Sequence, residues 1–62
     1  MENRTEFEIL KDAMHNEGSV SPNKDEIPVF DNMIKKGFLG YDDDGYFITR
    51  KGIQYYDDFS HI

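Results

Sequence analysis

The sequence predicts one α+β domain in which a helix, a short turn, a second helix, a two-stranded hairpin and a third helix follow one another. Two segments carry apolar residues at helical spacing, and each is followed by a glycine, which is typical of a helix C-terminus. Further along, two aromatic and β-branched segments flank an Asp-Asp-Asp-Gly sequence, which favours a hairpin. The 62 residues include no cysteine, so we expect the five Phe and four Tyr side chains to supply much of the apolar burial.

The first helix is predicted to begin at Thr5 and to end at Gly18. Thr5 and Glu8 have the spacing of a capping box, in which each side chain accepts a hydrogen bond from the other residue's backbone N–H. Glycine adopts the left-handed conformation that closes a helix without a Cβ clash, which makes Gly18 the expected stop. The face of this helix that we expect to be buried carries Phe7, Leu10 and Met14, widened by Ile9 and Ala13.

The middle of the chain is expected to form a short extended segment, a turn and the second helix. Residues 19–21 lead into Pro22, and a proline favours extended backbone in the residue before it. Pro28 would break a helix that contained it in its interior, so residues 22–27 are predicted to form a turn and the helix to start near Pro28. The helix is predicted to end at Gly37. The side chains expected to face inward are Phe30, Met33 and Ile34.

Residues 38–48 are predicted to form the hairpin and residues 50–59 the last helix. The segment 42–45 separates the two strands, because Asp and Gly tolerate the positive φ angles of a tight turn. Thr49 precedes the last helix at the N-cap position. The expected core comprises Phe7, Leu10, Met14, Phe30, Met33, Ile34, Leu39, Ile48, Ile53 and Tyr56, with Phe59 at the end of the same helix face.

The charge of the chain excludes several classes of partner. A net charge of −6, from thirteen acids and seven bases, argues against nonspecific nucleic-acid binding and against docking on anionic lipid. No apolar stretch approaches the roughly 20 residues of a membrane span. Residues 1–4 are too charged to open a signal peptide. We therefore expect a soluble, cytoplasmic protein that does not contact a membrane.

No set of residues has the spacing of a catalytic, cofactor or metal site. Aligning residues 42–45 with a calcium loop places Gly40 and Lys51 where an acid and a Glu are required, so a solvated hairpin tip is the preferred interpretation. The two imidazoles, His15 and His61, lie at opposite ends of the chain. The glycines are spaced as turns and the serines lack a nucleophile elbow. The sequence predicts a protein that is not an enzyme and binds no cofactor and no metal.

Three short motifs resemble winged-helix proteins. Residues 29–39 (VFDNMIKKGFL) are similar to the end of a recognition helix that leads into a wing in regulators of the MarR kind. Residues 46–52 (YFITRKG) resemble the exit of such a wing, and residues 7–11 resemble the first helix of the same fold. The layout of residues 5–59 is similar to the YjcQ family of small bacterial and phage proteins. The resemblance implies a winged helix-turn-helix domain with a two-stranded wing and a short C-terminal helix, of bacterial, phage or prophage origin.

Two departures from that pattern lead to two hypotheses about function. The helix that braces the recognition helix is reduced here to residues 23–27, and Asp25 and Glu26 would face phosphates where regulators place DNA-contacting residues. The first hypothesis is therefore a small acidic regulatory module that binds a protein partner. The alternative is a transcriptional regulator, most simply a homodimer, that binds double-stranded DNA.

The surface expected to contact the partner combines the exposed side of the second helix with the hairpin tip. A duplex presents a row of phosphates that would repel three adjacent carboxylates, whereas a protein can offer opposite charges in register. DNA contact would require a continuous basic face from the helix to the hairpin. The candidate partner-binding residues are Lys24, Asn32, Lys35, Lys36, Asp42, Asp43, Asp44, Arg50 and Lys51.

Overall fold

The first helix, α1 (Glu6–His15), begins where the capping box predicts it. In the computed structural model, which describes residues 3–60, the Thr5 hydroxyl accepts from the Glu8 N–H at 3.1 Å, and the Glu8 carboxylate accepts from the Thr5 N–H at 2.9 Å. The prediction that Gly18 stops the helix is wrong. Glu17 already adopts a left-handed conformation, with φ of 57°, so the chain leaves the helix before it reaches the glycine.

The next three elements are strand β1 (Ser19–Val20), the 3₁₀ turn η1 (Lys24–Glu26) and helix α2 (Ile27–Lys36). Pro28 lies in the first turn of α2, where its missing N–H would have had no partner within the helix, so the predicted turn and helix start are confirmed. Gly37 ends α2 in the left-handed conformation, with φ of 85°.

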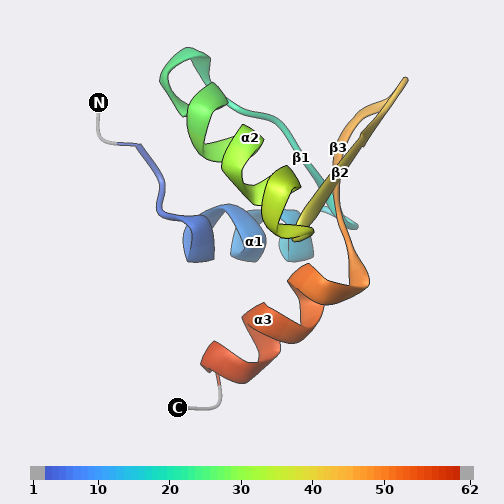
Figure 1. The fold of residues 1–62 in the computed structure, drawn as a ribbon. Coiled ribbons are helices and arrows are strands. Elements are labelled where there is room, and N and C mark those ends of the chain that lie inside the picture. The colour runs from blue at the N-terminus through green and yellow to red at the C-terminus, as the bar shows by residue number, and fades with distance from the viewer. Residues whose placement is uncertain (1–2, 61–62) are drawn as a thin grey trace.

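The predicted hairpin forms from β2 (Leu39–Asp42) and β3 (Gly45–Ile48), but the sheet has three strands and not two. The strand order is β1-β3-β2, and both pairings are antiparallel. β1 joins the hairpin because Ser19 pairs with Phe47 and Val20 with Tyr46, which buries the Val20 side chain. The described part of the chain is therefore an α+β domain with a three-stranded antiparallel sheet (Figure 1).

Helix α3 (Arg50–Ser60) begins at the predicted cap. The Gly52 N–H donates to the Thr49 hydroxyl at 3.1 Å, and the Ile53 N–H donates to the Thr49 carbonyl at 2.9 Å. The Thr49 hydroxyl donates in turn to the Gly37 carbonyl, which connects the start of α3 to the end of α2. α3 extends from this junction away from the sheet and packs on α1 (Figure 1).

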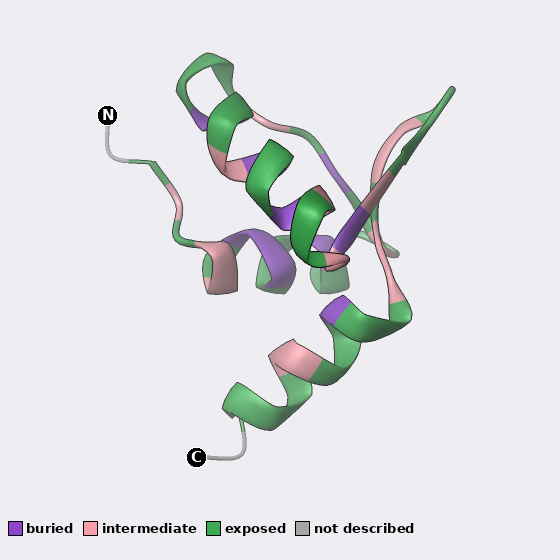
Figure 2. Ribbon diagram, in the orientation of Figure 1, coloured by how far each residue is buried: buried purple, intermediate pink, exposed green. Residues whose placement is uncertain are grey.

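The core lies between α1, α2 and the sheet, and buried residues line the facing sides of these elements (Figure 2). Four predicted core residues are fully or almost fully buried, namely Leu10, Phe30, Met33 and Leu39, and Ile9, Ala13 and Val20 complete the buried set. Four more are half-buried around it, namely Phe7, Ile34, Ile48 and Tyr56.

Two core predictions are wrong. Met14 and Ile53 are each 40% exposed. The buried stripe of α1 follows Ile9 and Ala13, which leaves Met14 beside it at the solvent boundary. Ile53 lies on the outer side of α3, because the face turned toward the domain carries Gly52 and the half-buried tyrosines.

Aromatic rings of α3 contact α1 and residue 38, and we call Phe7, Phe38, Tyr55, Tyr56 and Phe59 the α3 aromatic cluster. Phe7 of α1 stacks on Tyr56 with ring centroids 5.1 Å apart, and it also contacts Phe59 at 6.0 Å. Tyr55 stacks on Phe59 at 4.7 Å and meets Phe38 edge-on at 4.5 Å. Phe59 remains 50% exposed, so this cluster is a partly solvated layer outside the main core.

Replacing Gly52 with Ala is expected to destabilise the domain by about 1–3 kcal/mol, although alanine is the better helix former. An added Cβ would lie 2.3 Å from the Phe38 carbonyl oxygen, and a backbone atom cannot move aside cheaply. The measurement is the free energy of unfolding in urea. Stabilisation by about 1 kcal/mol, as helix propensity alone predicts, would show that α3 is not closely packed here.

Gly40→Ala is the matched control for that prediction. A Cβ at residue 40 would also meet an atom at 2.3 Å, but that atom belongs to the Phe47 ring. The Phe47 side chain is 38% exposed and can rotate toward solvent. Gly40→Ala should therefore cost less than Gly52→Ala.

Candidate protein-interaction surface

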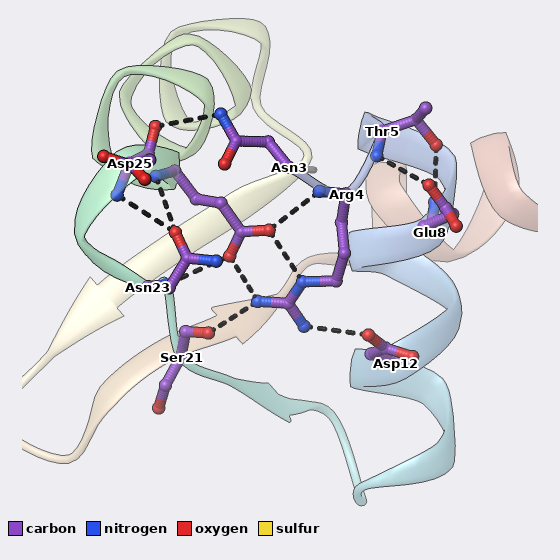
Figure 3. A network of polar contacts seen from close by, with 9 residues as sticks. Asn3, Arg4, Thr5, Glu8, Asp12, Ser21, Asn23 and Asp25 are labelled. Carbon is purple, nitrogen blue, oxygen red and sulfur yellow. Dashed lines mark hydrogen bonds and ion pairs between the residues drawn. The ribbon is translucent and has the colours of Figure 1, made fainter. Parts of the chain in front are cut away.

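A buried ion pair between Arg4 and Glu26 holds the start of α2 in place (Figure 3). The Arg4 Nη2 lies 2.6 Å from the Glu26 Oε1, and its Nε lies 2.9 Å from the Oε2. The backbone N–H groups of Arg4 and Asn23 donate to the same carboxylate at 2.9 and 3.0 Å. Glu26 is fully buried, and four donors thus replace the water that its two oxygens have lost.

Arg4 also joins parts of the chain that are distant in sequence (Figure 3). Its Nη1 contacts the Asp12 carboxylate of α1 at 2.8 Å, and its Nη2 donates to the Ser21 carbonyl at 2.8 Å. The Asn23 side chain accepts from the Glu26 N–H at 3.1 Å, which completes a capping box around η1. One guanidinium therefore fixes the entry to α1, the end of β1 and η1 relative to one another.

Each group of this pair stabilises the charged form of the other. Hydrogen bonds from the Arg4 side chain lower the pKa of Glu26 to about 2, and they do so against burial, which raises it. The same bonds raise the pKa of Arg4 above its ordinary value. Glu26 is therefore ionised at neutral pH and turned inward. The expectation that Glu26 would face phosphates is wrong, because its carboxylate is enclosed by η1 and the residues before α1.

Sequence reasoning missed this network, although one signal was present. Asn23 and Glu26 have the same capping-box spacing as Thr5 and Glu8. That spacing turns Glu26 back toward the turn and away from solvent. No comparable signal points to Arg4, because its partners are reached only through the tertiary fold.

The outer face of α2 carries charges of both signs. Asn32 and Lys35 are exposed, as expected, but Asp31 is exposed among them. Lys36 is also exposed, and its Nζ lies 2.9 Å from a carboxylate oxygen of Glu6 in α1. The net positive charge that α2 presents to a partner is therefore small.

The hairpin tip concentrates negative charge. Asp43 and Asp44 form a two-residue loop between the paired residues Asp42 and Gly45. The Asp44 N–H donates to the Asp42 carboxylate at 2.9 Å, and Gly45 supplies the positive φ of 113° that the turn requires. All three aspartates are exposed, so this tip places three carboxylates together at the free end of the hairpin (Figure 1).

An aromatic row connects the core to this acidic tip. Phe30 meets Tyr46 edge-on with ring centroids 5.0 Å apart, and Tyr46 meets Tyr41 at 4.7 Å. Phe30 is fully buried, whereas Tyr41 is 66% exposed. The row therefore ends in the solvent-exposed phenol of Tyr41, one residue before the tip aspartates. The Tyr41 ring is braced by its contact with the Tyr46 ring.

The remaining candidate residues lie apart from the tip. α2 and the hairpin form a V whose two arms meet at residues 37–38 (Figure 1). Lys24 lies on η1 at the far end of one arm, and the acidic tip lies at the far end of the other. Lys51 lies near the point where the arms meet, with its Nζ 5.8 Å from the centroid of the Phe38 ring. Arg50 precedes it at the exposed start of α3.

The fold thus brings Asn32 and Lys35 together on α2 and the three aspartates together on the tip, but it does not gather the cations into one continuous face. Within residues 3–60, no group of three or more His, Asp or Glu side chains is arranged to hold a metal ion. No helix in the same range has the length and apolarity that a membrane span requires. His61 lies outside the described residues.

A comparison of the chain with protein-family models, with curated protein sequences and with solved structures finds no match.

Proposed function

We propose that this domain is a winged helix that binds a protein partner through the outer face of α2 and the tip of the β2–β3 hairpin. The order of elements supports the fold: a helix, a short strand, a turn, a second helix and a hairpin, with β1 pairing to β3. In this interpretation α2 corresponds to the recognition helix and β2–β3 to the wing.

The observation that carries the proposal is the exposed acidic tip beside an exposed, braced tyrosine. Tyrosine is enriched in protein interfaces, because it supplies a large contact area at little cost in side-chain entropy. Carboxylates around such a ring steer a complementary basic surface into register and repel acidic competitors. Tyr41 and the tip aspartates provide this combination on one element.

The same charges weigh against the alternative of DNA binding, which the winged-helix layout would also allow. Residues 24–45 span η1, α2 and the whole hairpin turn, and they present three bases and five exposed acids, since Glu26 is buried against Arg4. One of the three bases, Lys36, already contacts Glu6. Phosphates that approached α2 would meet Asp31, and those that approached the wing would meet three carboxylates.

Changing Asp42, Asp43 and Asp44 together to Asn is expected to weaken partner binding at least about tenfold and to leave the domain folded, because all three side chains are exposed. The unmodified domain should bind random duplex DNA no more tightly than about 10⁻⁴ M at physiological salt, and the variant should bind it equally well or better. The measurements are capture from a cytoplasmic extract and a salt-dependent duplex shift assay, run side by side.

A variant that loses negative charge elsewhere is the control. Glu17→Gln and Asp25→Asn remove two negative charges from exposed positions away from the hairpin tip and from α3, and this variant should retain the captured partner. Tight binding of the unmodified domain to one duplex sequence, lost on changing Lys35 and Lys36, would contradict the proposal and favour the DNA-binding regulator.

A further inference from the structure

The charges of α3 are arranged against its own dipole. A helix has a partial positive charge at its N-terminus and a partial negative charge at its C-terminus. α3 begins with Arg50 and Lys51 and has no acid in its first turn. It ends near Asp57 and Asp58 and has no base in its last turn. Each of these charges is unfavourable in an isolated helix.

We propose that two copies of this chain associate through the outer faces of α3, with the two helices antiparallel. In this arrangement the basic start of each helix lies beside the acidic end of the other. Arg50 faces Asp58 of the second copy, and the twofold axis passes near Gln54. The two charges that are unfavourable within one helix then form two symmetric Arg50–Asp58 pairs, which is the self-complementarity that a twofold interface requires.

The outer face of α3 is open to such a neighbour. Arg50, Gln54 and Asp58 are exposed, and within residues 3–60 neither Arg50 nor Asp58 takes part in an ion pair. Ile53 is 40% exposed on the same outer side. The opposite side of the helix holds Gly52 and the half-buried tyrosines against the rest of the domain, which leaves Arg50, Gln54 and Asp58 in solvent.

The reach of the side chains fits this pairing. Arg50 and Asp58 are eight residues apart, or about 12 Å along the helix, so two antiparallel copies bring both pairs into register at once. Packed helix axes lie about 8–10 Å apart, a separation that an arginine and an aspartate can bridge. Ile53 is one residue from Gln54, which turns it about 100° around the helix, so it lies at the edge of the contact.

The interface is small, so the dimer is expected to be weak. α3 has 11 residues and is about 16 Å long, and a pair of such helices buries less area than a standard protein interface. A dissociation constant on the order of 10⁻⁴ M is expected for an interface at the lower end of the size range. This surface is distinct from the α2 and hairpin surface, so its test stands apart from that of the proposed function.

The test is sedimentation velocity of the full chain from about 10 µM to about 1 mM, with Arg50→Glu and Asp58→Arg as single variants and as the double variant. Each single variant places like charges together at both ends of the interface and should raise the dissociation constant about tenfold or more. The double variant reverses both signs and should restore self-association. An equimolar mixture of the two single variants should also associate. The glutamate introduced at position 50 of one chain then faces the arginine introduced at position 58 of the other, and the unchanged Asp58 and Arg50 form the second pair.

The same variants also show whether a loss of association reflects a loss of folding. Arg50→Glu places an acid at the start of α3 and Asp58→Arg a base near its end, so each single variant should unfold at the same or a higher temperature than the parent chain. Loss of association with retained stability, followed by recovery in the double variant, supports the antiparallel pairing. A chain that is monomeric at about 1 mM, single variants that still associate, or a double variant that does not recover would each overturn it.

Discussion

Replacing Glu26 with Gln is expected to lower the free energy of unfolding by about 3 kcal/mol at pH 7. The variant removes the buried anion of the Arg4 guanidinium, which keeps only the exposed Asp12, and turns an amide NH₂ toward hydrogen-bond donors. The pKa of Glu26 leads to a similar figure, because lowering it from 4.5 to about 2 corresponds to about 3 kcal/mol of stability. Urea unfolding monitored by circular dichroism is the measurement.

The pH dependence of this effect has a definite sign. A carboxyl group whose pKa is lower in the folded state stabilises the fold above its unfolded pKa and loses that contribution as the pH falls. The difference in stability between the parent and Glu26→Gln should therefore be complete above about pH 5 and should shrink as the pH falls toward 2.

Two further measurements keep this prediction testable if the variant is too unstable to study. Asp12→Asn removes the other anion that Arg4 contacts, but Asp12 has a side chain that is 50% exposed, so its loss should cost no more than about 1 kcal/mol. A direct titration of the Glu26 carboxyl carbon by NMR needs no variant. A pKa near 4.5 in the folded protein would contradict the prediction.

Phe30→Ala should cost about 3–5 kcal/mol, which is comparable to the whole stability of a chain of this size. Phe30 is fully buried at the point where α2 meets the sheet, and its ring packs edge-on against Tyr46 at 5.0 Å. Truncation leaves a cavity and removes the support beneath the aromatic row that ends at Tyr41. The variant should be largely unfolded at 25 °C by near-ultraviolet circular dichroism.

Two milder variants set the scale for that result. Phe30→Leu keeps most of the volume and should cost less than about 1.5 kcal/mol, which leaves the domain folded and measurable. Phe59→Ala removes a ring of the α3 aromatic cluster that is 50% exposed, so its cost should be about 1 kcal/mol. If Phe30→Ala cost no more than Phe59→Ala, the main core would not lie where Phe30 is.

The sequence predicts those features of the fold that depend on local rules. Thr5, Gly37 and Thr49 bound helices because capping and left-handed glycine act over a few residues, and the structure confirms all three. The hairpin tip follows in the same way from its own composition. These boundaries place α2 and the acidic tip, so the sequence alone predicts much of the candidate surface.

The features that were missed depend on contacts between distant parts of the chain. β1 has two residues and becomes a strand only because β3 lies beside it. Glu26 is buried because Arg4 reaches it across 22 positions of sequence. Periodicity also does not decide which row of a helix lies deepest: it predicts Met14, Ile9 and Ala13 on one face, and only Ile9 and Ala13 are buried.

Thr49 has a consequence that reaches beyond the capping of one helix. Its hydroxyl donates to the Gly37 carbonyl, and its N–H donates to the Phe38 carbonyl, at the point where α2 gives way to β2. The two proposed surfaces, on α2 with the hairpin and on α3, are therefore joined through this one residue. If binding at one surface changes the affinity of the other, the change is reciprocal. Any free energy that partner binding gains from α3 pairing, pairing gains from partner binding in the same amount.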